Sequence, residues 1–549
     1  MNKNSKKSLI AWILAGITGL VVFIMFFNQA FPTASIDLRL SKEEVIEKAT
    51  EFVTEQGFQL EGFDRTIVFD SDYYASIYLQ KTQGIAKANQ LIRQGVPMWF
   101  WQVRWFKELQ KDGFSVYIDP ATGEIVHFQY AVLDDAQGAN LTLEQAKKIA
   151  EQKVLSQGID LEVYKVKENI NKEQKNRTDY SFSWEKKDYT IGDATLIVSA
   201  NIYGDKLGYF GRYLKIPEDF IRDLQKDLSY GQVLSILTVI FMFVLGISAL
   251  VVMIIQFKKD NVSWKPGLAW GAGVALLAII AFVNSIPLLW TSYPDTMSKN
   301  IFVVISAAAA LIGSLVSGLV IFLFWASGEA LSREVWSRRF PLLEALKKKE
   351  FKSAEVFSPI ITGYCLAFLF LGYITIFYLV GRKFFHIWMP PEVEYSNILG
   401  TALPFLFPLT LAVTAAVSEE FMFRMFSISF FKKCFKLTWL GILLPAVIWA
   451  FAHSNYPVFP AYVRGIELTI AGIVFGIVYV KYGLETVLIT HFVIDAVLGG
   501  LPLLRSHNLY FTASGAIVML AVFIPVIILF FMAKKTKGDI SNGVSHSSV

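Results

Sequence analysis

Residues 418–424 read Ser-Glu-Glu-Phe-Met-Phe-Arg and lie within an otherwise apolar run over about residues 398–431. Two adjacent carboxylates, Glu419 and Glu420, are followed by Arg424 about one helical turn later. A charged side chain at membrane depth costs at least about 2.5 kcal/mol, so ionisable residues in such a segment mark a candidate functional site. The run therefore predicts a membrane helix that carries such a site.

The composition predicts a membrane protein with one water-soluble part. Of 549 residues, 54% are hydrophobic and 18% are charged, which is too apolar for a soluble protein and too charged for a chain embedded throughout. Apolar segments cover approximately residues 9–27, 230–257, 267–290, 301–325, 357–380, 398–431, 437–455, 465–482, 484–503 and 511–533. We expect an α-helical polytopic membrane protein of about ten transmembrane helices, with an extracytoplasmic α+β domain inserted after the first helix.

Basic residues set the expected orientation in the cell membrane. Lysines and arginines cluster at about 258–265, 333–352, 432–436 and 534–537, and the alternate loops are poorer in them. By the positive-inside rule both termini are cytoplasmic and residues 32–228 are extracytoplasmic, with Arg382 and Lys383 as exceptions. The net charge of +5 is modest and belongs to these loops, so we expect a lipid bilayer and no nucleic acid as partner.

The first apolar run could be a signal peptide or an uncleaved anchor. It follows Lys3, Lys6 and Lys7, and a weak small-residue cleavage site lies at 28–30. We expect an anchor, because the run is long for a signal peptide and long enough to span a bilayer.

The soluble part contains an internal repeat. Residues 40–57 align without gaps on residues 141–158, at an offset of 101 positions (141 − 40). Each copy begins with a capping-box pattern, Ser41 with Glu44 and Thr142 with Gln145, and each ends in glycine. Each repeat is therefore expected to open with a capped helix.

Strands are expected after each of these helices. Residues 116–128 read as a hairpin with a Pro/Gly turn, and residues 197–213 read as its counterpart. A helix and a hairpin that ends in DPATGEIVHF (119–128) resemble the PepSY-type module, a small extracytoplasmic α+β unit. A structural domain without chemistry is the simpler interpretation, and its partner is unknown. The aromatic run 99–101 is expected in a core strand.

Two of the six histidines, His453 and His491, lie within apolar segments. A lone buried histidine is usually structural, but two of them after paired glutamates favour a shared site. Trp449 and His453 are four residues apart, as are His491 and Asp495, so each pair is expected to share one helix face.

Spacing also distinguishes the two glutamates. Glu420 and Arg424 are four residues apart and can pair on one helix face. Glu419 is rotated from Glu420 by about 100°, so it has no partner within its own helix. Glu419 is therefore the stronger candidate for a catalytic role. Glu420 and Arg424 are expected to support the site.

Depth is consistent with a meeting of Glu419 and His453. Each lies 17 residues from a turn expected near Lys436 (436 − 419 and 453 − 436), which is about 25 Å along a helical hairpin. His491 would lie nearer the cytoplasmic face, and the four residues can still converge if one helix is broken. The candidate positions for the break are Pro404, Pro408 and Pro445.

Such a set of side chains could activate water. A carboxylate in an apolar cavity can act as a general base, which is the role expected of Glu419. His453 could orient the same water or protonate a leaving amine. His491 with Asp495 could stabilise a developing oxyanion by hydrogen bonding.

The ordered motifs Glu419-Glu420-x-x-x-Arg424, Trp449-x-x-x-His453 and His491-x-x-x-Asp495 resemble those of the CPBP intramembrane protease family. That family, which includes the type II CAAX prenyl endopeptidases, carries EExxxR, FxxxH and HxxxN or HxxxD on successive membrane helices. The resemblance covers about residues 357–533 and departs from the pattern at Trp449, where phenylalanine is usual. It implies an intramembrane glutamic endopeptidase with Glu419, His453, His491 and Asp495 as catalytic residues, and with Glu420, Arg424 and Trp449 in support.

The resemblance favours a metal-free mechanism without cofactor, with zinc as the alternative, because two histidines and a carboxylate could hold this metal. The substrate would be a membrane-associated protein or peptide. A non-proteolytic scaffold, a transporter-associated protein or a sensor with the same fold remains the alternative function.

The chain thus divides into five parts. They are a tail and anchor (1–31), an extracytoplasmic domain with two PepSY-like repeats (32–228), additional membrane helices with a basic cytoplasmic loop (229–356), a CPBP-like protease core (357–533) and a basic cytoplasmic tail (534–549).

Overall fold

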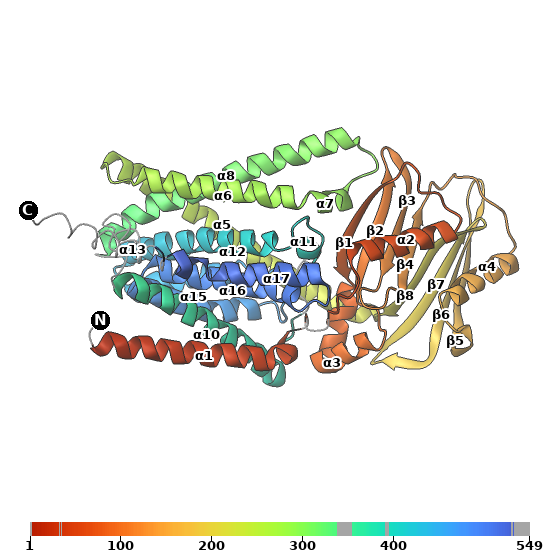
Figure 1. The fold of residues 1–549 in the computed structure, drawn as a ribbon, viewed down its shortest axis with the longest axis horizontal. Helices are drawn as coiled ribbons and strands as arrows, with labels where there is room; N and C mark the ends of the chain where they lie inside the picture. The colour runs from red at the N-terminus through yellow and green to blue at the C-terminus, as the bar shows by residue number, and fades with distance from the viewer. Residues whose placement is uncertain are drawn as a thin grey trace, which may run out of the picture.

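The computed structural model describes residues 3–31, 33, 36–336, 354–389, 395–528 and 531. A bundle of long helices is joined at one end to a sheet domain, and helix α1 begins at the opposite end of the bundle (Figure 1). The basic residues expected at 337–353 and in the tail after residue 533 lie outside the described residues.

The mostly helical character of the chain is confirmed. Among the described residues, eight helices are long and apolar enough to cross a membrane. They are α1 (Lys3–Ala30), α5 (Glu218–Lys258), α6 (Trp264–Asn284), α8 (Lys299–Val335), α10 (Ala354–Phe385), the continuous helix Leu406–Phe435, α15 (Val463–Tyr482) and α16 (Leu484–Leu504). Two shorter apolar helices, α14 (Thr438–Phe451) and α17 (Leu509–Val522), occupy the other two expected positions.

The soluble part forms one antiparallel sheet of eight strands. Its strands are β1 (Asp64–Ser71), β2 (Trp99–Lys107), β3 (Gln110–Ile118), β4 (Ile125–Ala131), β5 (Tyr164–Glu173), β6 (Thr178–Ile191), β7 (Ala194–Tyr203) and β8 (Lys206–Lys215). The order is β1-β2-β3-β4-β8-β7-β6-β5, so each half is a meander and the last strands of the two halves pair with each other. Both expected hairpins are present, as β3–β4 and β7–β8.

Each half of the sheet domain begins with the expected capped helix, α2 (Lys42–Glu55) or α4 (Leu143–Ser156). In α2 the Glu44 amide donates to Ser41 Oγ at 3.2 Å, and the Ser41 amide donates to the Glu44 carboxylate at 2.7 Å. The same reciprocal bonds join Thr142 and Gln145. These local bonds satisfy amides that have no partner within a helix, which is why a four-residue pattern predicts the helix start.

The first half contains a helix that the sequence pattern did not predict, α3 (Tyr73–Arg93), between β1 and β2. It bends at Gly84, whose φ of 72° is accessible to glycine at little cost. The Tyr78 hydroxyl of α3 accepts hydrogen bonds from the amides of Asp193 and Ala194, which ties α3 to the second half of the sheet. The aromatic run that begins at Trp99 lies in core strand β2, as expected.

Helix α1 packs along α10 through glycine contacts between backbones. A Cβ added at Gly19 would lie 2.4 Å from the Phe368 carbonyl oxygen and 2.5 Å from Leu369 Cα. At the end of α1, the Arg382 guanidinium donates to the carbonyl oxygen of Gln29 at 2.9 Å and also to that of Ala30. Arg382, an exception to the charge rule, thus caps the end of a helix, where a cation is favoured.

This packing predicts opposite outcomes for two Gly→Ala substitutions. Gly19→Ala should lower the free energy of unfolding in detergent by about 1–3 kcal/mol, because the backbones must separate. Gly273→Ala is the matched control, since a Cβ on Gly273 of α6 meets no atom within 4 Å. It should be neutral or stabilising by up to about 1 kcal/mol. Equal stabilities of the two variants would contradict the tight contact of α1 with α10.

Candidate active site

Glu419 and Glu420 lie where one helix changes its winding. Helix α12 (Leu406–Glu419) continues as the π-helix η4 (Glu420–Ile428) and then as α13 (Ser429–Phe435). The Ser427 hydroxyl accordingly donates to the Met422 carbonyl, five residues back, at 2.7 Å. π-Helical turns are rare and frequent at functional sites, and no feature of the sequence predicted this one. The turn expected near Lys436 is present, since Lys436 has a φ of 63° and ends α13.

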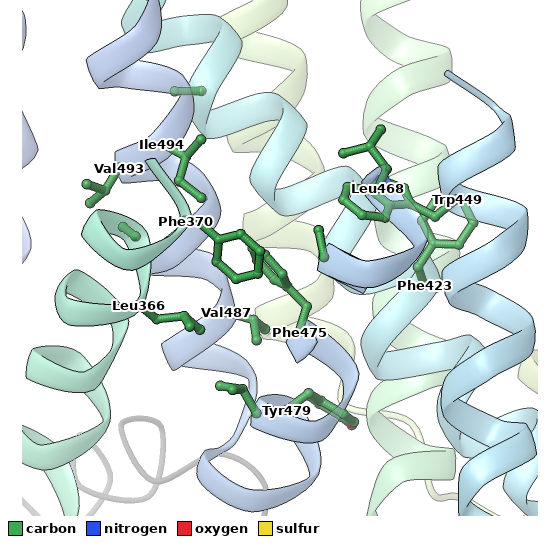
Figure 2. Packing of buried hydrophobic residues seen from close by; sticks show 14 of the residues in the cluster. Leu366, Phe370, Phe423, Trp449, Leu468, Phe475, Tyr479, Val487, Val493 and Ile494 are labelled. Carbon is green, nitrogen blue, oxygen red and sulfur yellow. The ribbon is translucent and has the colours of Figure 1, made fainter. Parts of the chain in front are cut away.

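Glu420 and Arg424 form the expected pair, and both side chains are buried. An Arg424 terminal nitrogen lies 3.2 Å from Glu420 Oε1, and the two side chains are 2% and 0% exposed. The Arg424 guanidinium also lies 4.2 Å from the ring centroid of Trp449 and 5.1 Å from that of Phe475. Buried charges require such partners, because an isolated buried ion would be strongly unfavourable. Figure 2 shows Trp449 and Phe475 among the buried hydrophobic side chains of the helical bundle.

His491 of α16 links the two glutamates. Its Nδ1 is 2.9 Å from Glu420 Oε1, and its Nε2 lies 3.8 Å from Glu419 Oε2 and 3.4 Å from Asp495 Oδ2. Because a carboxylate only accepts, Nδ1 carries a proton in the bond to Glu420. Both ring nitrogens thus face carboxylate oxygens, so a doubly protonated ring would have an acceptor on each side. The link from His491 to Glu420 was not predicted, since the sequence reasoning assigned His491 only to Asp495.

His453 lies one residue beyond the cap of α14 and not on the helix, which was expected to continue to about residue 455. Its Nδ1 is 2.8 Å from the Trp449 carbonyl oxygen, so the four-residue spacing still sets its orientation. A carbonyl accepts, so Nδ1 is protonated and Nε2 is left as the reactive nitrogen of the neutral ring. That Nε2 lies 3.9 Å from Glu419 Oε1.

Glu419 receives a hydrogen bond that the motif did not predict. The Trp449 indole Nε1–H donates to Glu419 Oε2. Trp449 was expected to supply an aromatic ring, but its N–H is a polar group that phenylalanine lacks. The side chains of Glu419, His453 and Asp495 are 23%, 19% and 27% exposed, so they are more open than Glu420 and Arg424.

The structure therefore brings all the expected residues together, although not through a break at a proline. Pro404 precedes α12, Pro408 lies in its first turn, and Pro445 lies within the continuous helix α14. The irregular features beside the site are instead the π-helix η4 and the end of α14 at Phe451.

Over the described ranges, no group of three or more His, Cys, Asp or Glu side chains has an arrangement that could hold a metal ion. The Nδ1 atoms of His453 and His491 are engaged by the Trp449 carbonyl and by Glu420, and both Nε2 atoms face Glu419. The observed arrangement suits proton transfer and hydrogen bonding at the two Nε2 atoms.

The fold and the site define a multi-span membrane protein with carboxylates and histidines gathered inside its helical bundle. Comparison with known families is consistent with this class. Residues 401–497 match the family model described as type II CAAX prenyl endopeptidase Rce1-like. This segment contains Glu419, His453, His491 and Asp495, so the resemblance drawn from the motifs is confirmed there.

The similarity to a curated protein extends over most of the chain. The chain is 24% identical to the sporulation-killing factor biosynthesis protein SkfC of Bacillus subtilis (strain 168) over 503 aligned residues. The alignment covers 90% of this chain and 95% of that protein. No solved structure matched the chain. The family and the relative together support a membrane endopeptidase type of function.

The buried Glu420–Arg424 pair predicts a non-additive response to mutation. Arg424→Met leaves the Glu420 carboxylate without its cation and should lower the free energy of unfolding by about 3 kcal/mol or more. Adding Glu420→Gln to Arg424→Met removes the uncompensated charge, so the double variant should regain part of that stability. Equilibrium unfolding in mixed detergent compares the wild type, the two single variants and the double variant. A double variant that loses the sum of the two single losses would contradict this coupling.

Proposed function

We propose that the protein is an intramembrane endopeptidase, which hydrolyses peptide bonds of membrane-associated proteins or peptides with a water molecule activated by Glu419. The carrying observation is that the Glu419 carboxylate faces Nε2 of both His453 and His491, at 3.9 and 3.8 Å. These separations are too long for direct hydrogen bonds.

The spacing between Glu419 and His453 suits a water molecule. A water oxygen at about 2.8 Å from both Glu419 Oε1 and His453 Nε2 would complete a triangle with the observed 3.9 Å side. Both of these atoms accept, so the water would donate one hydrogen to each and keep a lone pair for a substrate carbonyl.

The reaction then follows from the roles of these groups. As the water oxygen bonds to the carbonyl carbon, its proton passes to Glu419, and the carbonyl π electrons move to oxygen. His491 Nε2, beside Asp495, would donate a hydrogen bond to that oxyanion. Collapse of the tetrahedral intermediate breaks the C–N bond, and the proton is delivered to the leaving amine through Glu419 or His453.

The orientation and the division into domains are part of the proposal. Both termini are cytoplasmic, and the sheet domain, with its two PepSY-like repeats, lies outside the cytoplasmic membrane. The opposite placement of the start of α1 and the sheet domain supports this arrangement (Figure 1). The two comparisons suggest different substrates, since one name refers to CAAX prenyl proteins and the other to biosynthesis of a killing factor.

Glu419→Gln tests the function directly. The amide keeps the size of the side chain but is a poor proton acceptor, so cleavage should fall by about 10²- to 10⁴-fold while folding and insertion persist. Quantitative proteomics of membrane-associated peptides, in cells with the wild-type or variant protein, identifies fragments that depend on Glu419. Exposed Glu218→Gln, at the start of α5, is the matched control and should leave the fragments unchanged.

Unchanged cleavage by folded Glu419→Gln would refute the proteolytic mechanism. In that case a phenotype in transport or complex assembly that is insensitive to Glu419 would favour the non-proteolytic alternative.

A metal assay separates the two mechanisms of hydrolysis. The purified protein should contain much less than one zinc ion per chain, and cleavage should persist in a chelator, because carboxylate and imidazole groups carry the proton transfers. Elemental analysis and an EDTA titration measure this. Stoichiometric zinc whose removal stops cleavage would instead favour a metal-activated water.

A further inference from the structure

Trp449 contacts more of the site than an aromatic packing residue would need to. Its indole N–H donates to Glu419 Oε2, and its carbonyl oxygen holds His453 Nδ1 at 2.8 Å. The Arg424 guanidinium lies 4.2 Å from the centroid of its ring. Trp449 thus contacts Glu419 and His453, the two groups proposed to hold the water, and it also contacts the buried ion pair through Arg424.

The indole N–H fixes one oxygen of Glu419 and leaves the other available. Over the described residues, it is the one hydrogen-bond donor found for this carboxylate, since the histidine nitrogens lie at 3.8 and 3.9 Å. The bond is to Oε2, whereas Oε1 faces His453 Nε2. The Trp449 N–H therefore determines which oxygen is presented toward the proposed water.

The ring of Trp449 is itself rigidly placed. Trp449 is 5% exposed and is covered by the Arg424 guanidinium and by the rings of Phe475 and His491. Helix α15 carries Gly472 at the contact, where an added Cβ would lie 3.1 Å from Trp449 Cε3 and 2.9 Å from Ala446 Cβ. Because the Trp449 side chain already has so little freedom, its N–H can orient Glu419 without a further loss of conformational entropy by Trp449 itself.

We propose that Trp449 is a positioning residue, whose indole N–H holds the ionised Glu419 carboxylate in the orientation and proton affinity needed for water activation. This inference rests on the proposed function for its consequence in catalysis, but the interaction exists without substrate. It also gives a role to the departure from the FxxxH pattern, because phenylalanine would keep the ring over Arg424 and lose the hydrogen bond.

The first measurement needs no substrate. A carbodiimide modifies protonated carboxyl groups, so labelling of the peptide that contains Glu419, followed by mass spectrometry across pH, reports when this carboxyl binds a proton. Glu419→Gln identifies the background from Glu420. Trp449→Phe removes a donor to the ionised form, so half-maximal labelling should move up by about one pH unit.

The second measurement uses a peptide substrate found by the proteomic comparison. Trp449→Phe should lower kcat by about 10- to 100-fold with little change in KM, because Glu419 is misplaced for the chemical step only. The acid limb of the profile of kcat/KM against pH should move in the same direction as the labelling. Trp439→Phe is the matched control, since Trp439 lies on the same helix but is 59% exposed, and it should change neither readout.

If Trp449→Phe does not fold, replacement of Trp449 by 3-benzothienylalanine retains the shape and ring face and removes only the N–H. Unchanged labelling in the folded variant overturns the inference, even if kcat falls, because a merely structural role would lower activity without moving the pH dependence. A shift in labelling supports the interaction. If the wild-type protein then cleaves no peptide, the proposed function fails while the link from Trp449 to Glu419 stands.

Discussion

The central constraint is the burial of charge between apolar helices. Glu420 and Arg424 have almost no exposure, so each must be neutralised by a neighbour within the bundle. His491 Nδ1, on α16, lies 2.9 Å from Glu420 Oε1, and the Arg424 guanidinium lies over the ring of Trp449 on α14. These contacts tie together the three helical segments that carry the site. A rearrangement that separated the segments would leave a buried charge without a partner, which gives the site one strongly favoured geometry.

Local signals explain what could be predicted from the sequence. Capping boxes, glycine stops and hairpin turns depend on residues within a few positions of one another. The long apolar segments indicate candidate membrane spans by their length and composition. The residues of the site were also predictable, because ionisable side chains are conspicuous in such segments. Helix α3, the π-helical winding at Glu420 and the early end of α14 before His453 were not predicted. A local signal for α3 was present, because the Asp72 side chain caps its start by accepting from the Ala75 amide. No local pattern indicated the other two features.

The adjacent glutamates illustrate how tertiary contacts refine a prediction from spacing. Their different directions on the helix were predicted, and Glu419 pairs outside its own helix while Glu420 pairs with Arg424. Spacing alone did not reveal that His491 touches one carboxylate and faces the other. The buried pair therefore does more than make its own charge tolerable. Through His491, it also fixes the position of a ring proposed to meet the developing oxyanion.

The sheet domain belongs to the same framework as the site. The Arg104 guanidinium donates to the carbonyl oxygens of Thr291 and Tyr293, at 2.8 and 3.0 Å, so β2 is held on the segment between α6 and α8. The chain that continues from His453 reaches Phe459, whose ring stacks on Trp388 at 4.1 Å. Ile77 of α3 is buried in the same cluster. The sheet domain therefore packs, through α3, against the segment of chain that follows His453, as well as against the segment between α6 and α8.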